Sequence, residues 1–485
     1  MLYLGLDLGT SALKAVVIDE DQHVIASRDA AMTSSHPRPG WSEQPPADWI
    51  AAAEAVMEAL RAELGARMAD IAGIGLSGQM HGATLLAADD RVLAPCILWN
   101  DTRSAEQAAR LDADPDFRAI SGNIVFPGFT APKLVWLKET DPALFARVAR
   151  VLLPKDYLRL WLTGEHVSEM SDAAGTAWLD TGARDWSDRL LAASGMDRAQ
   201  MPALVEGTAP SGGLRTELAA RWGMRPGTVV AGGAGDNAAS GVGLGTVAPG
   251  DGFVSLGTSG VLFAACDAYT PRPETAVHSF CHALPGRWHQ MGVMLSAASA
   301  LAWFAGIAGA TPARLIADLG EQVGPPSPVT FLPYLSGERT PHNDPGLRAG
   351  FHGVSAGTTR EDMTRAVLDG VAFALKDNLD ALQAAGTRPA RLLAVGGGAR
   401  SDLWLSIIAG VLGLAVDRPA AGAGGAAFGA ARLGLIAAER ADPATICTPP
   451  PVARRFEPDP GLSGACAAAQ ARFQRLRETT HPTPT

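Results

Sequence analysis

Cysteine is scarce in this sequence. Its 485 residues include only five: Cys96, Cys266, Cys281, Cys447 and Cys466. They are odd in number and widely spread, unlike the closely spaced cysteines of a disulfide-stabilised secreted domain. This pattern favours a reducing compartment, and we expect a cytoplasmic protein.

Long apolar runs are missing as well. No stretch of about 18 residues free of breakers predicts a membrane span, and residues 295–310 are expected to form a buried helix. The segment MLYLGLDLGTS has no basic region and reaches aspartate and glycine early, so we expect no signal peptide.

Basic residues are outnumbered, 40 Lys and Arg against 50 Asp and Glu, which gives a formal net charge of −10. An acidic surface repels nucleic-acid phosphates and anionic lipid, so we expect neither nucleic acid nor membrane as a partner. Nothing in the sequence fixes the oligomeric state, and a homodimer is left open.

The chain is longer than the ~250–300 residues that one core usually supports, which predicts two domains. Short apolar strands are expected at 2–7, 14–19, 71–76 and 392–395, with helices at 47–64 and from residue 402. This alternation of strands and helices predicts an α/β fold.

The string LGTS occurs twice, at 8–11 and 256–259, each time between two apolar β-rich runs. One such turn per half of the chain indicates a duplicated domain. We place the boundary in the glycine-rich stretch 243–250, which gives domains 1–244 and 245–485.

The first LGTS turn follows Asp7. Glycine lets the backbone approach an anion, hydroxyls can bind phosphate oxygens, and a strand-end aspartate can hold Mg²⁺. An ordinary hairpin turn explains the same residues, but its repetition at Gly257, Thr258 and Ser259 favours two turns that face one nucleotide.

Asp236 lies in a glycine-rich loop, GGAGDN, after an apolar run. A carboxylate there suits a general base that takes a proton from a substrate hydroxyl. A turn or helix-cap role is the alternative, because Asp and Asn both favour it.

Two further segments carry polar or glycine-rich signals. Gly396 to Ser401 (GGGARS) is expected at a strand-to-helix junction, where backbone amides and the helix dipole favour anions, although an ordinary turn would look the same. Gln79 to Gly82 and Trp99 to Arg103 combine the amide, imidazole, indole and carboxylate groups that hold a sugar. A buried structural histidine is the alternative for His81. The spacing of His278, Cys281, His282 and His289 fits no standard zinc pattern.

These segments resemble the FGGY family of carbohydrate kinases, within the sugar kinase, Hsp70 and actin superfamily. The resemblance spans nearly the whole chain. It rests on DLGTS at 7–11, WSEQ at 41–44, GQMHGATLL at 78–86, ILWND at 97–101, LLPKDYLRL at 152–160, SDAAGT at 171–176, GDNAA at 235–239, SLGTSGV at 255–261, FLPYLSGERTPHN at 331–343 and GGGARS at 396–401.

The resemblance implies two ribonuclease-H-like domains around a central cleft, and phosphorylation of a sugar by ATP with Mg²⁺. The GQMHG and WND segments indicate D-xylulose as the sugar, phosphorylated at its 5-hydroxyl in xylose catabolism, with another ketose or polyol as the alternative. It implies that Asp236 and Asp7 are the catalytic residues, with Asp236 as the base, and that both serve the metal. It assigns Met80, His81, Trp99, Asn100, Asp101, Asp236 and Asn237 to the sugar, and Thr10, Ser11, Lys14, Gly257, Thr258, Gly397, Gly398 and Ser401 to ATP.

The sequence departs from the family pattern twice. The loop before Asp236 is one small residue longer, and residues 420–428 lack an acidic residue that relatives often carry. Two other classes share parts of the pattern. An actin- or Hsp70-like assembly protein would not need the polar cluster near His81, and a sugar-sensing regulator would carry a basic DNA-binding element.

Overall fold

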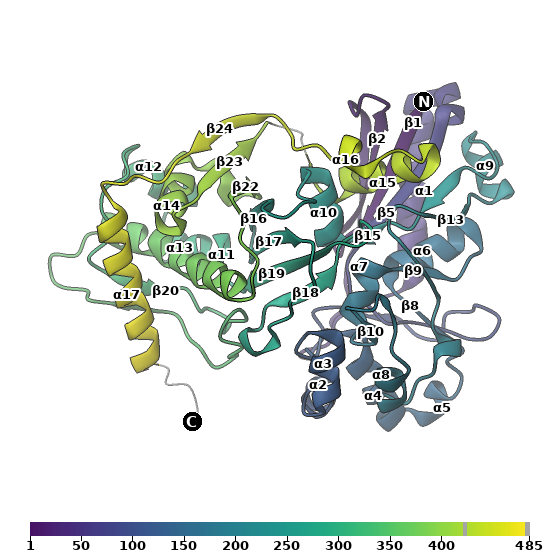
Figure 1. Cartoon of the computed structure of the whole chain (residues 1–485), viewed down its shortest axis with the longest axis horizontal. Coiled ribbons are helices and arrows are strands. Elements are labelled where there is room, and N and C mark those ends of the chain that lie inside the picture. The colour runs from purple at the N-terminus through teal and green to yellow at the C-terminus, as the bar shows by residue number, and fades with distance from the viewer. Residues whose placement is uncertain (421–423, 481–485) are drawn as a thin grey trace.

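Two mixed β-sheets organise the computed structural model, one in each lobe (Figure 1), and the structure describes residues 1–420 and 424–480. The first sheet contains β1 (Leu2–Leu8), β2 (Ala12–Asp19), β3 (Val24–Ala31), β5 (Ile71–Gly78), β13 (Pro210–Gly213), β14 (Val229–Ala231) and β15 (Ala234–Gly235). The second contains β16 (Gly252–Leu256), β17 (Gly260–Cys266), β18 (His278–Cys281), β19 (Trp288–Met294), β22 (Arg391–Val395), β23 (Ala415–Pro419) and β24 (Val452–Phe456).

The two sheets have the same strand order. The first runs β13-β14-β5-β1-β2-β3 and the second β24-β23-β22-β16-β17-β19, with β18 added at one edge. In each sheet a hairpin is antiparallel, the next two strands run parallel to its first strand, and the far edge strand is antiparallel. This agreement confirms the α/β fold and supports the duplication predicted from the LGTS repeat. The repeats form the β1–β2 and β16–β17 turns.

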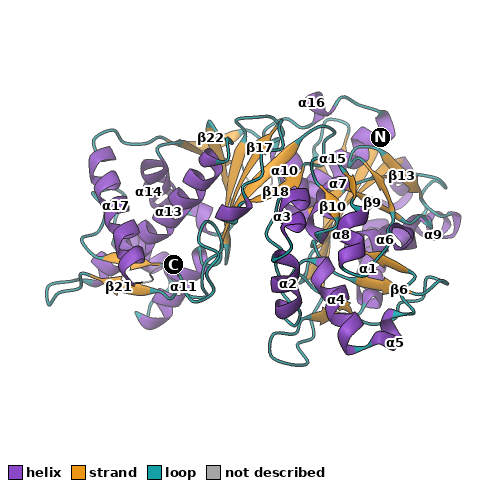
Figure 2. Cartoon of the chain, turned by 60° about the horizontal axis from the view of Figure 1, so that its bottom comes forward, coloured by secondary structure: helices purple, strands orange, loops and turns teal. Residues whose placement is uncertain are grey.

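Helices cover both sheets and fill the connections (Figure 2). In the first lobe they are α1 (Pro46–Leu64), α2 (Ala105–Asp112), α3 (Pro115–Ser121), α4 (Thr130–Thr140), α5 (Pro142–Phe145), α6 (Pro154–Thr163), α7 (Met170–Ala173), α8 (Asp188–Ala193) and α9 (Thr216–Trp222). The second half has α11 (Ala298–Ile307), α12 (Pro312–Asp318), α13 (Arg360–Ala384), α14 (Asp402–Leu412), α16 (Pro443–Ile446) and α17 (Ser463–Thr480). Short paired strands complete the connections: β4 (Glu43–Gln44) with β7 (Cys96–Ile97), β6 (Thr84–Leu86) with β8 (Arg150–Leu152), β9 (Val167–Glu169) with β12 (Ala203–Val205), β10 (Leu179–Asp180) with β11 (Asp185–Trp186), and β20 (Thr330–Leu332) with β21 (Gly350–His352).

Two helices cross between the lobes. α10 (Asp236–Leu244) packs against α15 (Ala426–Glu439), and α15 lies on β1 and β5 of the first sheet although it comes from the second half (Figure 1). The approach is close enough that a β-carbon at Gly75 would lie 1.8 Å from the Ala430 carbonyl oxygen. The division at residues 244 and 245 therefore stays a prediction about the chain, since in space α15 completes the first lobe.

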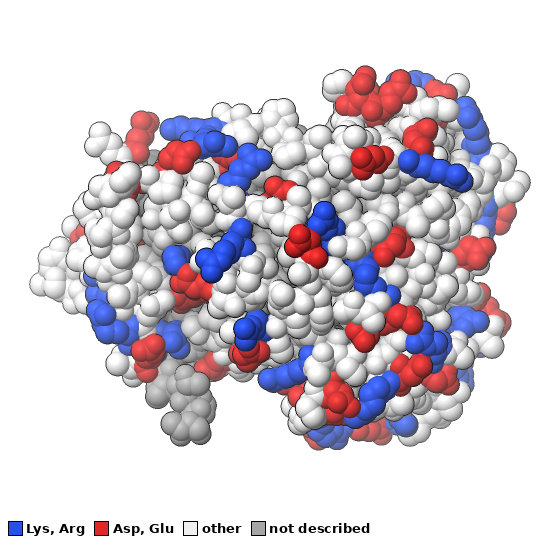
Figure 3. All heavy atoms as spheres, viewed as in Figure 1, with Lys and Arg blue, Asp and Glu red and all other residues white. Residues whose placement is uncertain are grey.

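The helix expected to be buried at 295–310 is α11, and that expectation was wrong in part, because Trp303 and Ile307 are 39% and 66% exposed. Within the described residues no single helix has the length and apolarity to cross a membrane. α11 and α12 have them only when taken together, and these two helices meet at an angle of 87°. Acidic and basic side chains are interspersed over the face in Figure 3.

Candidate active site

Two carboxylates meet at the carboxyl edge of the first sheet. β5 pairs in parallel with both β1 and β15, which places Asp7 beside Ser77 and Gly235 beside Gly78. Asp236 follows at once as the first residue of α10. Parallel strands end at a common edge, so Asp7 and Asp236 flank the same end of β5.

The surroundings of these carboxylates raise both pKa values. Burial raises the pKa of Asp7, whose Oδ1 accepts a hydrogen bond from Ser77 Oγ at 2.9 Å. Burial and then the Asp7 charge raise the pKa of Asp236 to about 6, against the amide and Nδ2 of Asn237, which donate to Oδ1 at 2.7 and 3.0 Å. Among the described residues neither carboxylate has an ion-pair partner within 4.0 Å. In the described part of the chain only Asn237 binds the Asp236 carboxylate, through Oδ1, which leaves Oδ2 available to accept a proton as a general base requires.

His81 presents a fixed hydrogen-bond acceptor. Its φ of 70° is uncommon for a residue other than glycine, and its ring stacks on Phe129 at 4.7 Å. Burial lowers the pKa of His81 to about 3, so the ring is neutral. Its Nδ1 lies 2.6 Å from the Gly175 carbonyl and must donate to it, which leaves Nε2 as an acceptor.

A buried lysine holds the turn at His81 in place. Lys133 Nζ donates to the carbonyls of His81 and Gly128, both at 2.8 Å, and burial lowers the pKa of Lys133 to about 7. Met80 lies between Gly235 and Gly175, where added β-carbons would approach its side chain to 2.9 and 3.0 Å. Met80 thus links the turn at His81 to the loop that carries Asp236 and Asn237.

Side-chain amides and indoles connect the β1–β2 turn to this site. Thr10 Oγ1 donates to Gln79 Oε1 at 2.9 Å and accepts from Trp99 Nε1 at 3.0 Å. Gln44 Oε1 in turn accepts from Gln79 and from Trp49, at 3.0 Å each. The hydroxyl of the half-buried Thr10 is therefore occupied by other side chains, while Ser11 and Lys14 are exposed. Lys14 lies opposite Asp7 in the backbone register of the hairpin.

The Trp99–Asp101 segment divides into two parts. Trp99 and Asn100 are exposed beside the β1–β2 turn. The Asp101 carboxylate is buried, accepts from the Ser42 amide at 2.6 Å and forms a bidentate pair with Arg103. Asp101 therefore supports this loop through Ser42 and Arg103, and the sugar contact expected of it stays a prediction.

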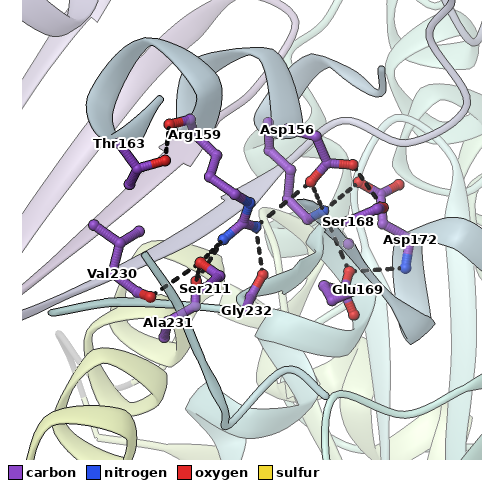
Figure 4. A network of polar contacts seen from close by, with 12 residues as sticks. Asp156, Arg159, Thr163, Ser168, Glu169, Asp172, Ser211, Val230, Ala231 and Gly232 are labelled. Atoms are coloured by element: carbon purple, nitrogen blue, oxygen red, sulfur yellow. Dashed lines mark hydrogen bonds and ion pairs between the residues drawn. The ribbon is translucent and has the colours of Figure 1, made fainter. Parts of the chain in front are cut away.

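A buried ionic network behind the Asp236 loop was not assigned any role from sequence (Figure 4). Lys155 Nζ lies 2.7 Å from Asp156, 3.0 Å from Asp172 and 3.3 Å from Glu169, and all four side chains are inaccessible. Burial raises the pKa of Asp172 well above its ordinary value, although Lys155 opposes the shift. The Glu169 carboxylate accepts from the Ser171 amide at 2.7 Å, and Ser171 Oγ accepts from the Gly235 amide at 3.0 Å.

Arg159 belongs to the same network and holds the other end of the loop (Figure 4). Its guanidinium donates to the carbonyls of Ala231 and Gly232 at 2.7 and 2.5 Å. The loop before Asp236 is thus held at both ends, and within it β15 pairs with β5. The available signal was the presence of charged residues inside the apolar helix at 154–163.

The second lobe contributes a pocket of about 800 Å³ beside the β16–β17 turn. Three of the residues assigned to ATP line it: Gly397, Gly398 and Ser401. Gly257 and Thr258 lie next to it, since their carbonyls accept from the amides of α11 residues, including Ala298, which also lines the pocket. Its size and glycine-rich wall suit a nucleotide base and ribose. Within the loop 420–428, residues 421–423 lie outside the described residues.

The histidines at 278–289 lie in an aromatic cluster. His289 stacks on Phe263 at 4.6 Å, and His282 Nε2 lies 3.2 Å from the Thr246 carbonyl. In the described ranges, no group of three or more His, Cys, Asp or Glu side chains is placed to hold a metal ion.

Comparisons with known proteins agree with this architecture. The pattern of the FGGY family of carbohydrate kinases matches with its N-terminal domain at residues 2–243 and its C-terminal domain at 252–438. The chain is 47% identical to a xylulose kinase of Escherichia coli K12 over 99% of both chains. It is similar to the crystal structure of "a xyloylose kinase from Brucella ovis" (61% identity, TM-score 0.98, 99% of both chains). It is also similar to that of xylulose kinase from Rhodospirillum rubrum (30% identity, TM-score 0.93, 99% of both chains).

Proposed function

This chain belongs to the FGGY family of carbohydrate kinases, and on that premise we propose that it transfers the γ-phosphoryl group of ATP to the 5-hydroxyl of D-xylulose. The observation that carries the proposal is the position of Asp236. Its free carboxylate oxygen shares one edge of the first sheet with Met80 and His81, and the pocket at Gly397 lies in the other lobe.

Asp236 is the general base in this proposal. A primary alcohol is a poor nucleophile until its proton is removed, and a carboxylate with a pKa of about 6 can take that proton near neutral pH. Asn237 holds Oδ1, so Oδ2 faces the hydroxyl. His81 Nε2 accepts from a second hydroxyl of the sugar and fixes its direction.

The residues present fit a magnesium ion. Asp7 and Asp236 are hard oxygen donors without an ion-pair partner among the described residues, and the charge of one raises the pKa of the other, a repulsion that a divalent cation relieves. They would hold Mg²⁺, which when bound neutralises charge on the transferred phosphoryl group. Ser77 orients Asp7 for this role.

The two lobes divide the binding work. Gly397, Gly398 and Ser401 bind the nucleoside, while Thr258 and the β1–β2 turn, in which Ser11 is exposed, approach the phosphates from opposite sides. Closure of the lobes would align the phosphoryl group and exclude water. We further infer a cytoplasmic enzyme. The homodimer stays a prediction.

The names of the relatives support D-xylulose, because the Escherichia coli protein that is 47% identical is a xylulose kinase. A coupled ADP-release assay over a panel of ketoses and polyols tests the substrate. We expect kcat/KM for D-xylulose to exceed that for glycerol and L-ribulose by at least ~10²-fold, a ratio reachable when a wrong substrate leaves polar groups unpaired. A higher value for another ketose or polyol would replace the substrate but leave the kinase class intact.

A further inference from the structure

Arg339 occupies a rigid loop of the second lobe. The neighbouring Thr340 donates its amide to the Val293 carbonyl at 3.0 Å, and its Oγ1 donates to the Ala276 carbonyl at 2.8 Å. The Glu338 carboxylate accepts from the Leu295 and Arg339 amides, both at 2.8 Å. The backbone at Arg339 therefore has little freedom.

The Arg339 side chain reaches across to the first lobe. Its Cζ lies 4.7 Å from the ring centroid of Phe126, which belongs to the connection between α3 and α4. Within the described parts of the chain the guanidinium has no carboxylate partner within 4.0 Å and makes no side-chain hydrogen bond. Burial lowers its pKa. A partly buried guanidinium with unused donors is costly unless a ligand or water meets it.

Arg339 faces the same space as His81. The ring centroids of Phe126 and Phe129 lie 5.7 Å apart, and the Phe129 ring stacks on the His81 ring. After burial, the Arg339 charge is a further cause of the lowered pKa of both His81 and His278. Arg339 and His81 thus lie on the same pair of aromatic rings, Phe126 and Phe129, at the junction of the lobes.

We propose that Arg339 binds the carbonyl end of the sugar and selects a ketose against the corresponding polyol, an inference that rests on the proposed function. The hydroxyl to be phosphorylated must lie at Asp236, in the loop whose Gly235 packs against Met80, and His81 follows Met80 on the side of Gly175. The far end of the sugar therefore lies at His81 and Arg339. A carbonyl oxygen only accepts hydrogen bonds and a guanidinium only donates them, so the two groups match.

The test uses Arg339→Met, Arg339→Lys and Arg388→Met in the full chain. Arg388 is an exposed arginine of the same lobe and is the matched control. Two quantities are measured: kcat/KM for D-xylulose relative to a pentitol that has a hydroxyl in place of the carbonyl, and the Kd for D-xylulose without ATP.

A hydrogen bond to a charged group contributes ~1.5–3 kcal/mol, so Arg339→Met is expected to lower kcat/KM for D-xylulose by ~10–10²-fold and to raise Kd similarly. The pentitol should lose much less, so the preference for the ketose shrinks. Arg339→Lys keeps the charge without the planar fork and should give an intermediate loss. If Arg339→Met does not fold, the inference is tested by Arg339→Lys alone, through its ratio of kcat/KM for D-xylulose to kcat/KM for the pentitol.

Three results would overturn the inference: an unchanged ratio in the Arg339 variants, an equal loss for both substrates, or a loss confined to KM for ATP. Failure of the proposed function looks different. It would appear in the wild-type protein as a lack of activity with D-xylulose, whereas failure of this inference leaves the wild type active and the variants equally selective.

Discussion

The two sheets share one topology, yet their central turns differ in chemistry. When the LGTS repeats are aligned, Asp7 in β1 corresponds to Ser255 in β16. Thr10 is tied to Gln79 and Trp99, whereas Thr258 is exposed. The charged residue stands only in the lobe that we assign to the sugar.

The next parallel strand of each sheet continues this contrast. β5 leads into the polar turn that carries Met80 and His81, while β22 leads into glycines. A β-carbon at Gly396 would lie 2.8 Å from Leu256 backbone atoms, so the second lobe uses close backbone approach where the first uses fixed side chains. A duplicated scaffold has thus acquired two kinds of site through its loops.

Asp236 has no counterpart in this comparison, and its replacement should have the largest effect. Asp236→Asn keeps the size but cannot take a proton, so we expect kcat to fall ~10²–10⁴-fold in steady-state assays. Asp442→Asn, at the N-cap of α16, is the control and should change kcat little. A variant with more than ~10% of the wild-type kcat would remove Asp236 as the base and make Asp7 the next candidate.

Arg159 tests whether the Asp236 loop depends on the buried network. Arg159→Met leaves the Ala231 and Gly232 carbonyls without their donor and removes one of the two cations that face Asp156. Breaking such a buried pair destabilises by ~3–5 kcal/mol, so we expect a clearly lower midpoint in denaturant unfolding, together with reduced kcat. Arg189→Met, which breaks exposed pairs with Asp114 and Asp116, should lower the midpoint much less, because solvent screens exposed ion pairs. Equal losses in both variants would show that burial of the network adds nothing.

Exchanging the corresponding residues of the two turns sharpens the comparison directly. Asp7→Ser gives the first hairpin the residue of the second and should lower kcat on the order of 10²-fold, the usual effect of losing one transition-state stabiliser. The Mg²⁺ concentration for half-maximal rate should rise. The reciprocal Ser255→Asp adds a negative charge beside the phosphates and should raise KM for ATP without restoring activity to Asp7→Ser. If the double variant recovered wild-type kcat, the lobes would be interchangeable, contrary to our assignment.

Much of this arrangement was predictable because it follows local pattern. The hairpins at Asp7 and Gly257 were expected from apolar runs broken by the same turn, and the placement of Gly397 and Ser401 followed from the strand before them. The supporting contacts of Asp101 were not predictable, because sequence distance does not reveal that Arg103 and the Ser42 amide bind its carboxylate.

Two other features depend on contacts between distant segments. The packing of α15 on β5 joins residues more than 350 positions apart, and no local periodicity encodes it. The role of Arg159 likewise appears only when the Ala231 and Gly232 carbonyls are brought beside α6.

The pH dependence of the rate should report Asp236. A general base works when deprotonated, so kcat/KM should be level above pH 6 and fall about tenfold per unit below it. In the residual activity of Asp7→Ser this acid limb should move to lower pH, because the Asp7 charge is one cause of the raised pKa. If the acid limb lay at the same pH in both proteins, the Asp7 charge would have no effect on the pKa of Asp236, contrary to this prediction.

Stability gives the same pKa an independent readout. The pKa of Asp236 is raised in the folded state above its unfolded value near ~4, so its contribution to stability is largest below that pH and is lost as pH rises through 6. Asp236→Asn lacks this loss. The Tm of Asp236→Asn minus the Tm of the wild type should therefore increase as pH rises from 4 to 7, in thermal unfolding at fixed ionic strength.

The smallest expected effect concerns the glycines of the second lobe, where adjacent positions serve different purposes. Gly397 has φ of −63° and no atom within 4 Å of an added β-carbon, so Gly397→Ala leaves the fold intact and extends a methyl group into the pocket. An added methyl in a filled site costs about 1 kcal/mol, so KM for ATP should rise ~5-fold while KM for D-xylulose stays unchanged.

Gly398→Ala is the matched control, because its β-carbon would lie 2.9 Å from Leu256 and 3.1 Å from Trp404. Gly398→Ala should therefore lower the Tm, whereas Gly397→Ala should leave the Tm unchanged. An unchanged KM for ATP in a fully folded Gly397→Ala variant would place the nucleotide elsewhere. The second lobe would then no longer be a nucleotide site built by close backbone approach.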